Sequence, residues 1–117
     1  MPKPGADEAT TREGYTRVLK AFKRWLGRYT LRPQTIERHV SNVQRFAEAY
    51  LERQQPPLAF HEVTPTDMHN YLIKALPPDI WAKDTVPSFK KFFKFMGETG
   101  RMDYGTACDI LDDLRIW

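Results

Sequence analysis

The sequence has a single cysteine, Cys108, which excludes an internal disulfide framework and any zinc site built from several cysteines. It has only three histidines, and none of them has a nearby cysteine or a clear third ligand. It also has no glycine-rich phosphate loop and no serine–histidine–aspartate signature. We therefore predict no metal site, no cofactor and no catalytic activity.

Long apolar runs are also missing. No stretch approaches the roughly 18 consecutive apolar residues of a membrane span, and the polar start, Met1 to Arg12, does not resemble a signal peptide. With 41% hydrophobic and 28% charged residues, the 117-residue chain has the composition of one globular domain. We expect a loose leader over residues 1–9, a single domain over residues 10–117, a cytoplasmic location and no membrane partner.

Apolar residues recur at helical spacing in five segments, which proline- and glycine-containing stretches separate. The predicted helices cover about residues 10–29, 33–54, 65–76, 84 to 97 or 100, and 103–116. The fold class is therefore predicted to be all-α, a compact bundle of about five helices.

Capping residues indicate where several of these helices begin and end. Thr10 or Thr11 is suited to cap the first helix, and Thr64-Pro65-Thr66-Asp67 is a strong start for the third. The fourth helix is expected to begin at Asp84 or Thr85, with Pro87 in its first turn. It is expected to end at Gly97 or Gly100.

Charge is unevenly distributed along the chain. Residues 1–55 contain 11 basic and 6 acidic side chains, whereas residues 56–117 contain 7 basic and 9 acidic ones. Between residues 12 and 45 there are nine Lys or Arg residues and only two acidic residues, Glu13 and Glu37. Such a concentration of positive charge favours an anionic partner, with nucleic acid as the first choice.

The first and second predicted helices each present a basic face. Opposite the apolar stripe of the first lie Arg17, Lys20, Arg24 and Arg28, with no acid to offset them. On the second, Arg38, Asn42 and Arg45 are spaced i, i+4, i+7 and form one ridge. These residue types contact phosphates and can read guanine and adenine edges. The alternative for both faces is an ordinary solvated surface.

Three further groups have two interpretations each. Thr35 is placed to cap the second helix or to donate to a phosphate, and Ser88 to do the same in the fourth. Lys90, Lys91 and Lys94 are placed to bind phosphates or to cover neighbouring aromatic rings with their stems. The phenylalanines of the fourth helix are interpreted as core rather than as a base-stacking platform.

Three segments, taken in order, resemble the core-binding domain of tyrosine recombinases and phage integrases. Residues 31–36 (LRPQTI), with Val43, Phe46 and Tyr50-Leu51, resemble its S-x-x-T…L…F…L helix. Residues 63–68 (VTPTDM) followed by Tyr71-Leu72 resemble its (I/V)T-x-x-D(I/L)…YL element. Residues 88–100 resemble its L-R-x-F-F-x-F-L-x-E-x-G helix. The resemblance covers about residues 31–100.

This resemblance implies a SAM-like helical bundle that clasps duplex DNA, with the second and fourth helices facing the major groove. By position it assigns DNA contacts to the following residues: Thr35, Arg38, Asn42, Arg45, Ser88, Lys90, Lys91 and Lys94. Arg17, Arg24 and Arg28 of the first basic face join them as predicted phosphate contacts. A role in DNA recombination or DNA integration, and association with the nucleoid, are further implications of the family.

The sequence also departs from that family. It ends at Trp117, before the family's catalytic domain, so we expect either a recombinase fragment or a standalone, non-catalytic domain. Arg32 stands where the first motif has serine, and Asp103-Tyr104-Gly105 replaces the usual Asn-Pro. The alternative function is a helical protein-interaction module without a DNA role. Its partner, or a second copy of the chain, would dock on the last helix or near Trp81.

Overall fold

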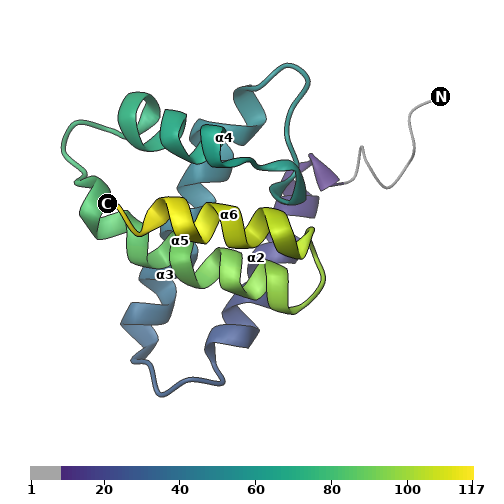
Figure 1. Cartoon of the computed structure of the whole chain (residues 1–117). Coiled ribbons are helices and arrows are strands. Elements are labelled where there is room, and N and C mark those ends of the chain that lie inside the picture. Colours follow the sequence, from purple (N-terminus) through teal and green to yellow (C-terminus); the bar gives the residue numbers. More distant parts are fainter. Residues whose placement is uncertain (1–8) are drawn as a thin grey trace.

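A computed structural model describes residues 9–117, and over these residues the chain is all-helical, with no strand. The predicted all-α bundle is confirmed (Figure 1). Except for residue 9, the predicted leader over residues 1–9 lies outside the described residues. The five α-helices of this region are α2 (Arg12–Leu26), α3 (Pro33–Ala49), α4 (Pro65–Asn70), α5 (Ala82–Glu98) and α6 (Tyr104–Leu114).

Helix α5 is the central element of the bundle. It packs against α2 and α3 and also against α6, which returns alongside it after a short loop (Figure 1). Helix α4 packs on α6. The four phenylalanines of α5 are buried, which confirms their interpretation as core: Phe89, Phe92, Phe93 and Phe95. α5 therefore fixes where its neighbours α2 and α3 present their polar faces.

Local capping residues define several helix ends as the sequence predicts. The Thr11 hydroxyl accepts a hydrogen bond from the Gly14 amide at 3.0 Å at the start of α2. At the start of α4, the Thr64 hydroxyl accepts from the Asp67 amide at 3.2 Å, and Asp67 accepts from the Thr64 amide at 2.9 Å. This reciprocal pair is a capping box and satisfies two donors that the helix itself leaves free.

Helix α5 ends at Glu98, with Thr99 at the C-cap, so that of the two predicted glycines Gly97 lies inside the helix and Gly100 follows its end. Gly100 adopts a φ of 71°, and the Arg101 amide donates back to the Met96 carbonyl at 2.9 Å. Glycine suits this position because a left-handed conformation carries no Cβ penalty there. Gly97 has a different role, since a Cβ on it would lie 3.0 Å from the Cβ of Ala107 in α6.

Several predicted boundaries were wrong. Helix α3 stops at Ala49, and a 3-10 turn, η1 (Leu51–Arg53), replaces its predicted last turn. A second 3-10 turn, η2 (Phe60–Glu62), lies in the connector to α4, and α4 continues into a π-helix, η3 (Tyr71–Ala75). The 3-10 turns are tighter than an α-helix and the π-helix is wider, but all three have nearly the same spacing of apolar residues. The apolar pattern therefore does not distinguish them from an α-helix.

Helix α5 starts at Ala82, earlier than predicted, so Pro87 is inside the helix instead of in its first turn. The added first turn is closed by hydrogen bonds from the Asp84 amide to the Trp81 carbonyl and from the Thr85 hydroxyl to the Ala82 carbonyl, both 3.0 Å. A proline at this depth provides no N–H for the carbonyl four residues earlier. The longer helix adds Lys83 to the surface that faces α3.

Candidate nucleic-acid interface

A cleft of about 570 Å³ lies between α3 and the N-terminal part of α5. It brings together four of the predicted contact residues from α3 with residues of the loop before α5 and of its first two turns. The lining residues are Thr35, Arg38, His39, Asn42, Arg45, Ile80, Lys83, Asp84, Thr85 and Pro87. One wall of this concave surface is therefore lined by the α3 residues Arg38, Asn42 and Arg45.

A buried polar network lies at the base of this cleft. His39, Asn42 and Ser88 are 7%, 8% and 1% exposed. The Ser88 hydroxyl accepts a hydrogen bond from the Asn42 amide nitrogen at 2.9 Å and shares a second one, 2.7 Å long, with His39 Nδ1. The two α3 side chains are thus joined to α5 by a single hydroxyl group. Because buried polar groups are costly when unpaired, this network fixes the spacing of the two helices.

The same network orients one of the cleft arginines. Arg45 Nη1 donates to Asn42 Oδ1 at 3.2 Å, and Arg45 is half-buried. Its guanidinium is therefore held against the wall of the cleft instead of sampling many rotamers. A pre-positioned arginine loses less side-chain entropy when it binds an anion.

The environment of His39 favours the neutral form of its imidazole, because it lowers the pKa. Burial lowers its pKa below the ordinary 6.5, and the nearby positive charges of Lys91 and Arg38 lower it further. A neutral imidazole adds no charge to the base of the cleft. The positive charge of the site accordingly comes from its outer side chains.

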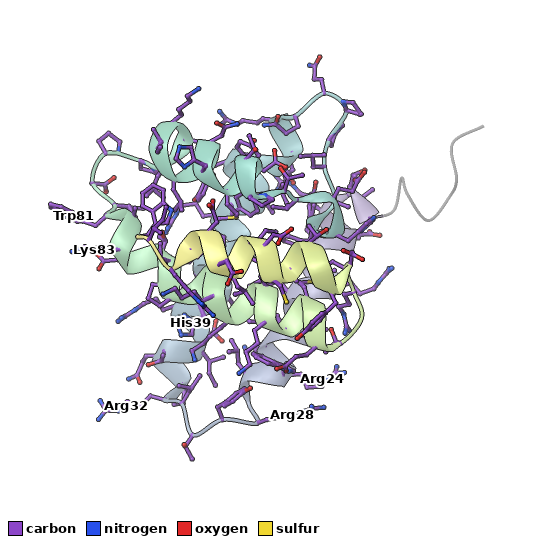
Figure 2. All side chains as sticks on the ribbon, viewed as in Figure 1. Arg24, Arg28, Arg32, His39, Trp81 and Lys83 are labelled. Carbon is purple, nitrogen blue, oxygen red and sulfur yellow. The ribbon has the colours of Figure 1, made fainter. Side chains whose placement is uncertain are left out.

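Those outer side chains are mostly basic. Arg38 and Lys83 are exposed, and Asp84 is the only acidic residue among the lining residues. Lys91 lies farther along α5, with its Nζ 5.7 Å from the centroid of the Tyr29 ring in the α2–α3 loop. Figure 2 shows Lys83 beside Trp81 at the N-terminal end of α5, with Arg24, Arg28 and Arg32 along the lower edge of the molecule. The basic surface thus extends from the cleft towards the α2–α3 loop.

Some predicted site residues have a different environment from the one expected. Asn42 and Ser88 are buried and bonded to each other, so Asn42 is not on the outer ridge and Ser88 does not cap a turn. Thr35 makes no capping hydrogen bond, because Arg32 holds the N-cap position of α3. Thr35 is half-buried and lines the cleft. The helical periodicity of the sequence predicted an outward-facing Asn42. Periodicity does not show that Ser88, 46 residues later, lies opposite Asn42 and hydrogen-bonds to it.

The remaining predicted residues lie on the surface. Lys90 and Lys94 are exposed on α5, and Lys94 Nζ lies 4.0 Å from Glu98 Oε1. Arg17, Arg24 and Arg28 are exposed on or just after α2. Arg17 lies beside Glu13 and Lys20, whereas Arg24 and Arg28 line a hollow nearer the C-terminal end of α5. The cations of the first predicted face are therefore divided between two places.

Six lining residues of the cleft were not among the predicted contacts, and they include His39 of the buried network and the exposed Lys83. His39 lies three positions before Asn42 on α3, and that helical spacing was available as a signal. Lys83 was missed because the predicted start of α5 fell after it. Both were found only when α3 and α5 were placed side by side.

No family model, no curated protein and no solved structure matches this chain. Within residues 9–117, no helix is both long and apolar enough to cross a membrane. No cluster of metal-ligating side chains occurs in this described part of the chain.

Proposed function

We propose that this chain is a non-catalytic duplex-DNA-binding domain of the tyrosine-recombinase core-binding type. The observation that supports this best is the concave α3–α5 cleft, which is lined by the three cations Arg38, Arg45 and Lys83 and by a single acid, Asp84. An anionic ligand with repeated phosphates would neutralise the positive charge of this surface. Phosphate contacts supply most of the affinity of nonspecific DNA binding. Under this proposal the protein is cytoplasmic and associates with the nucleoid.

The contacts divide by environment. Arg38, Lys83 and Lys90 are exposed and suited to phosphates, whereas Arg45 is held by Asn42 and is the best-positioned residue for a base edge. Asn42 and Ser88 support the interface by positioning Arg45 and the two helices. Lys91 lies farther along α5 than the cleft and, through its contact with the Tyr29 ring, extends the basic surface to the α2–α3 loop.

The test is fluorescence anisotropy with a labelled random-sequence duplex of about 30 base pairs, at two salt concentrations. We expect a dissociation constant on the order of micromolar that weakens steeply as salt rises. The double variant Arg38→Glu/Lys83→Glu should abolish binding, because it reverses two exposed charges that make no hydrogen bond or ion pair within the described residues.

The control is the single variant Arg53→Glu, which reverses an exposed arginine in η1, beyond the C-terminal end of α3. It changes the net charge in the same direction, and we expect it to retain most of the binding. Far-ultraviolet circular dichroism confirms that each variant is folded. Retained binding by the folded double variant, or no binding by the wild-type protein at low salt, would contradict the proposal.

A second function, protein interaction through α6, is favoured by two exposed apolar side chains at its ends. Tyr104 is 67% exposed, and Ile116, just beyond the helix, is 81% exposed. Gel filtration without DNA separates the two functions. A dimer or larger species that persists at high salt would favour the interaction module, whereas a monomer would favour the DNA-binding domain.

A further inference from the structure

A second basic hollow, of about 140 Å³, lies between the C-terminal part of α2 and the C-terminal end of α5. Three arginines line it together with apolar and aromatic side chains, and no acidic residue lines it. The lining residues are Ala21, Arg24, Trp25, Arg28, Phe95, Thr99 and Arg101. Arg101 comes from the α5–α6 loop, so residues 77 positions apart in the sequence meet in this hollow.

Arg101 is held in place from two directions. Its backbone amide is fixed by the hydrogen bond to the Met96 carbonyl that ends α5. Its guanidinium carbon lies 4.9 Å from the centroid of the Phe95 ring. Stacking on a ring occupies the flat face of a guanidinium and leaves its N–H edge available for hydrogen bonds. Arg101 is therefore preorganised to donate to a planar or tetrahedral oxyanion.

The two other arginines bring like charges to the same place. Arg24 is in the last turn of α2 and Arg28 lies just after its end, and both line the hollow, so their like charges repel each other there. Neither forms an ion pair with any described residue, in contrast to Lys23, whose Nζ lies 2.5 Å from Glu37 Oε1. An anion bound between the arginines would offset this repulsion.

We propose that the Arg24–Arg28–Arg101 hollow binds a phosphate group. The hollow would then contact a second phosphate of the bound duplex, and in this respect the inference rests on the proposed function. Lys91 lies on α5 between the residues that line the cleft and those that line the hollow, and its Nζ is 5.7 Å from the centroid of the Tyr29 ring, next to Arg28. α5 spans 17 residues, or about 25 Å. A duplex that reaches both the cleft and the hollow therefore contacts the protein along most of that helix.

The test compares the salt dependence of duplex binding for Arg28→Gln and Arg101→Gln with that of Arg53→Gln as the matched control. Loss of one phosphate contact makes the negative slope of log K against log salt shallower by about 0.9, which corresponds to roughly eightfold weaker binding at 0.1 M salt. We expect each hollow variant to show this change and the control to keep the wild-type slope. Arg28→Gln removes no ring contact, so it remains informative if Arg101→Gln unfolds.

A second measurement follows the Arg101 Nε–Hε signal by NMR as inorganic phosphate is titrated into the full chain. If the wild type binds duplex and the hollow variants keep its slope, the inference is overturned while the proposed function stands. If duplex binding is absent but phosphate shifts the signal saturably, and Arg28→Gln removes that shift, the hollow is a site for a free phosphate and the proposed function fails. If neither duplex nor phosphate binds, both are overturned.

Discussion

Replacing Ser88 with alanine removes the one hydroxyl group that joins α3 to α5 in the buried network. In the wild-type protein this oxygen accepts from Asn42 Nδ2 at 2.9 Å and is hydrogen-bonded to His39 Nδ1 at 2.7 Å. Ser88 is 1% exposed, so water does not replace the hydroxyl readily. The substitution creates only a small void, because alanine differs from serine by a single oxygen atom.

The cost therefore comes from the groups left without a partner. A buried donor or acceptor that loses its partner costs about 1–3 kcal/mol. For a domain of this size, about 1 kcal/mol lowers the melting temperature by roughly 4 °C. We expect Ser88→Ala to lower it by about 4–12 °C. The arginine that Asn42 orients should also become more mobile, so duplex affinity at fixed salt should fall.

Thermal and urea unfolding, followed by circular dichroism at pH 7, measure this loss. Ser41→Ala is the matched control, because Ser41 is an exposed hydroxyl residue on α3. It should change the free energy of unfolding by less than about 0.5 kcal/mol. A Ser88→Ala protein as stable as Ser41→Ala would show that the network does not hold the helices together and would refute this reasoning.

Two further predictions concern His39 and Trp81. The folded protein lowers the pKa of His39 below 6.5, so the unfolded chain takes up this proton first as pH falls. The free energy of unfolding should therefore rise between pH 5 and pH 7, and His39→Gln should flatten that rise; equal slopes in the two proteins would contradict this. Trp81 is 74% exposed beside the cleft, whereas Trp25 is 7% exposed, so Trp81 should report duplex binding by a change in tryptophan emission. Trp81→Phe should remove the change, and an undiminished change would place Trp81 away from the DNA.

The sequence predicted best the features that depend on neighbours in the chain. Thr11 and the Thr64–Asp67 capping box act within three residues, so local residue preferences were enough to place the starts of α2 and α4. The apolar periodicity of α2 and the dense phenylalanine pattern of α5 likewise predicted which faces are buried. The all-α class follows from these local signals.

Boundaries were less predictable where packing overrides local preference. The change from α4 to a π-helix and the early start of α5 at Ala82 leave the apolar spacing almost unaltered. Pro87 favoured a start close to itself, yet the chain extends the helix upstream of it. Sequence patterns alone do not measure the balance between a lost backbone hydrogen bond and the packing gained.

The sequence by itself determined the helical class, the segments that form helices and the excess of basic residues on the first two predicted helices. Only the tertiary structure decided that Asn42 faces inward to Ser88, that His39 and Lys83 belong to the cleft, and that Arg101 joins Arg24 and Arg28. The physical reason is the range of the interactions. Capping and periodicity act over a few residues, whereas these groupings bring together side chains from helices and loops that are distant in the sequence.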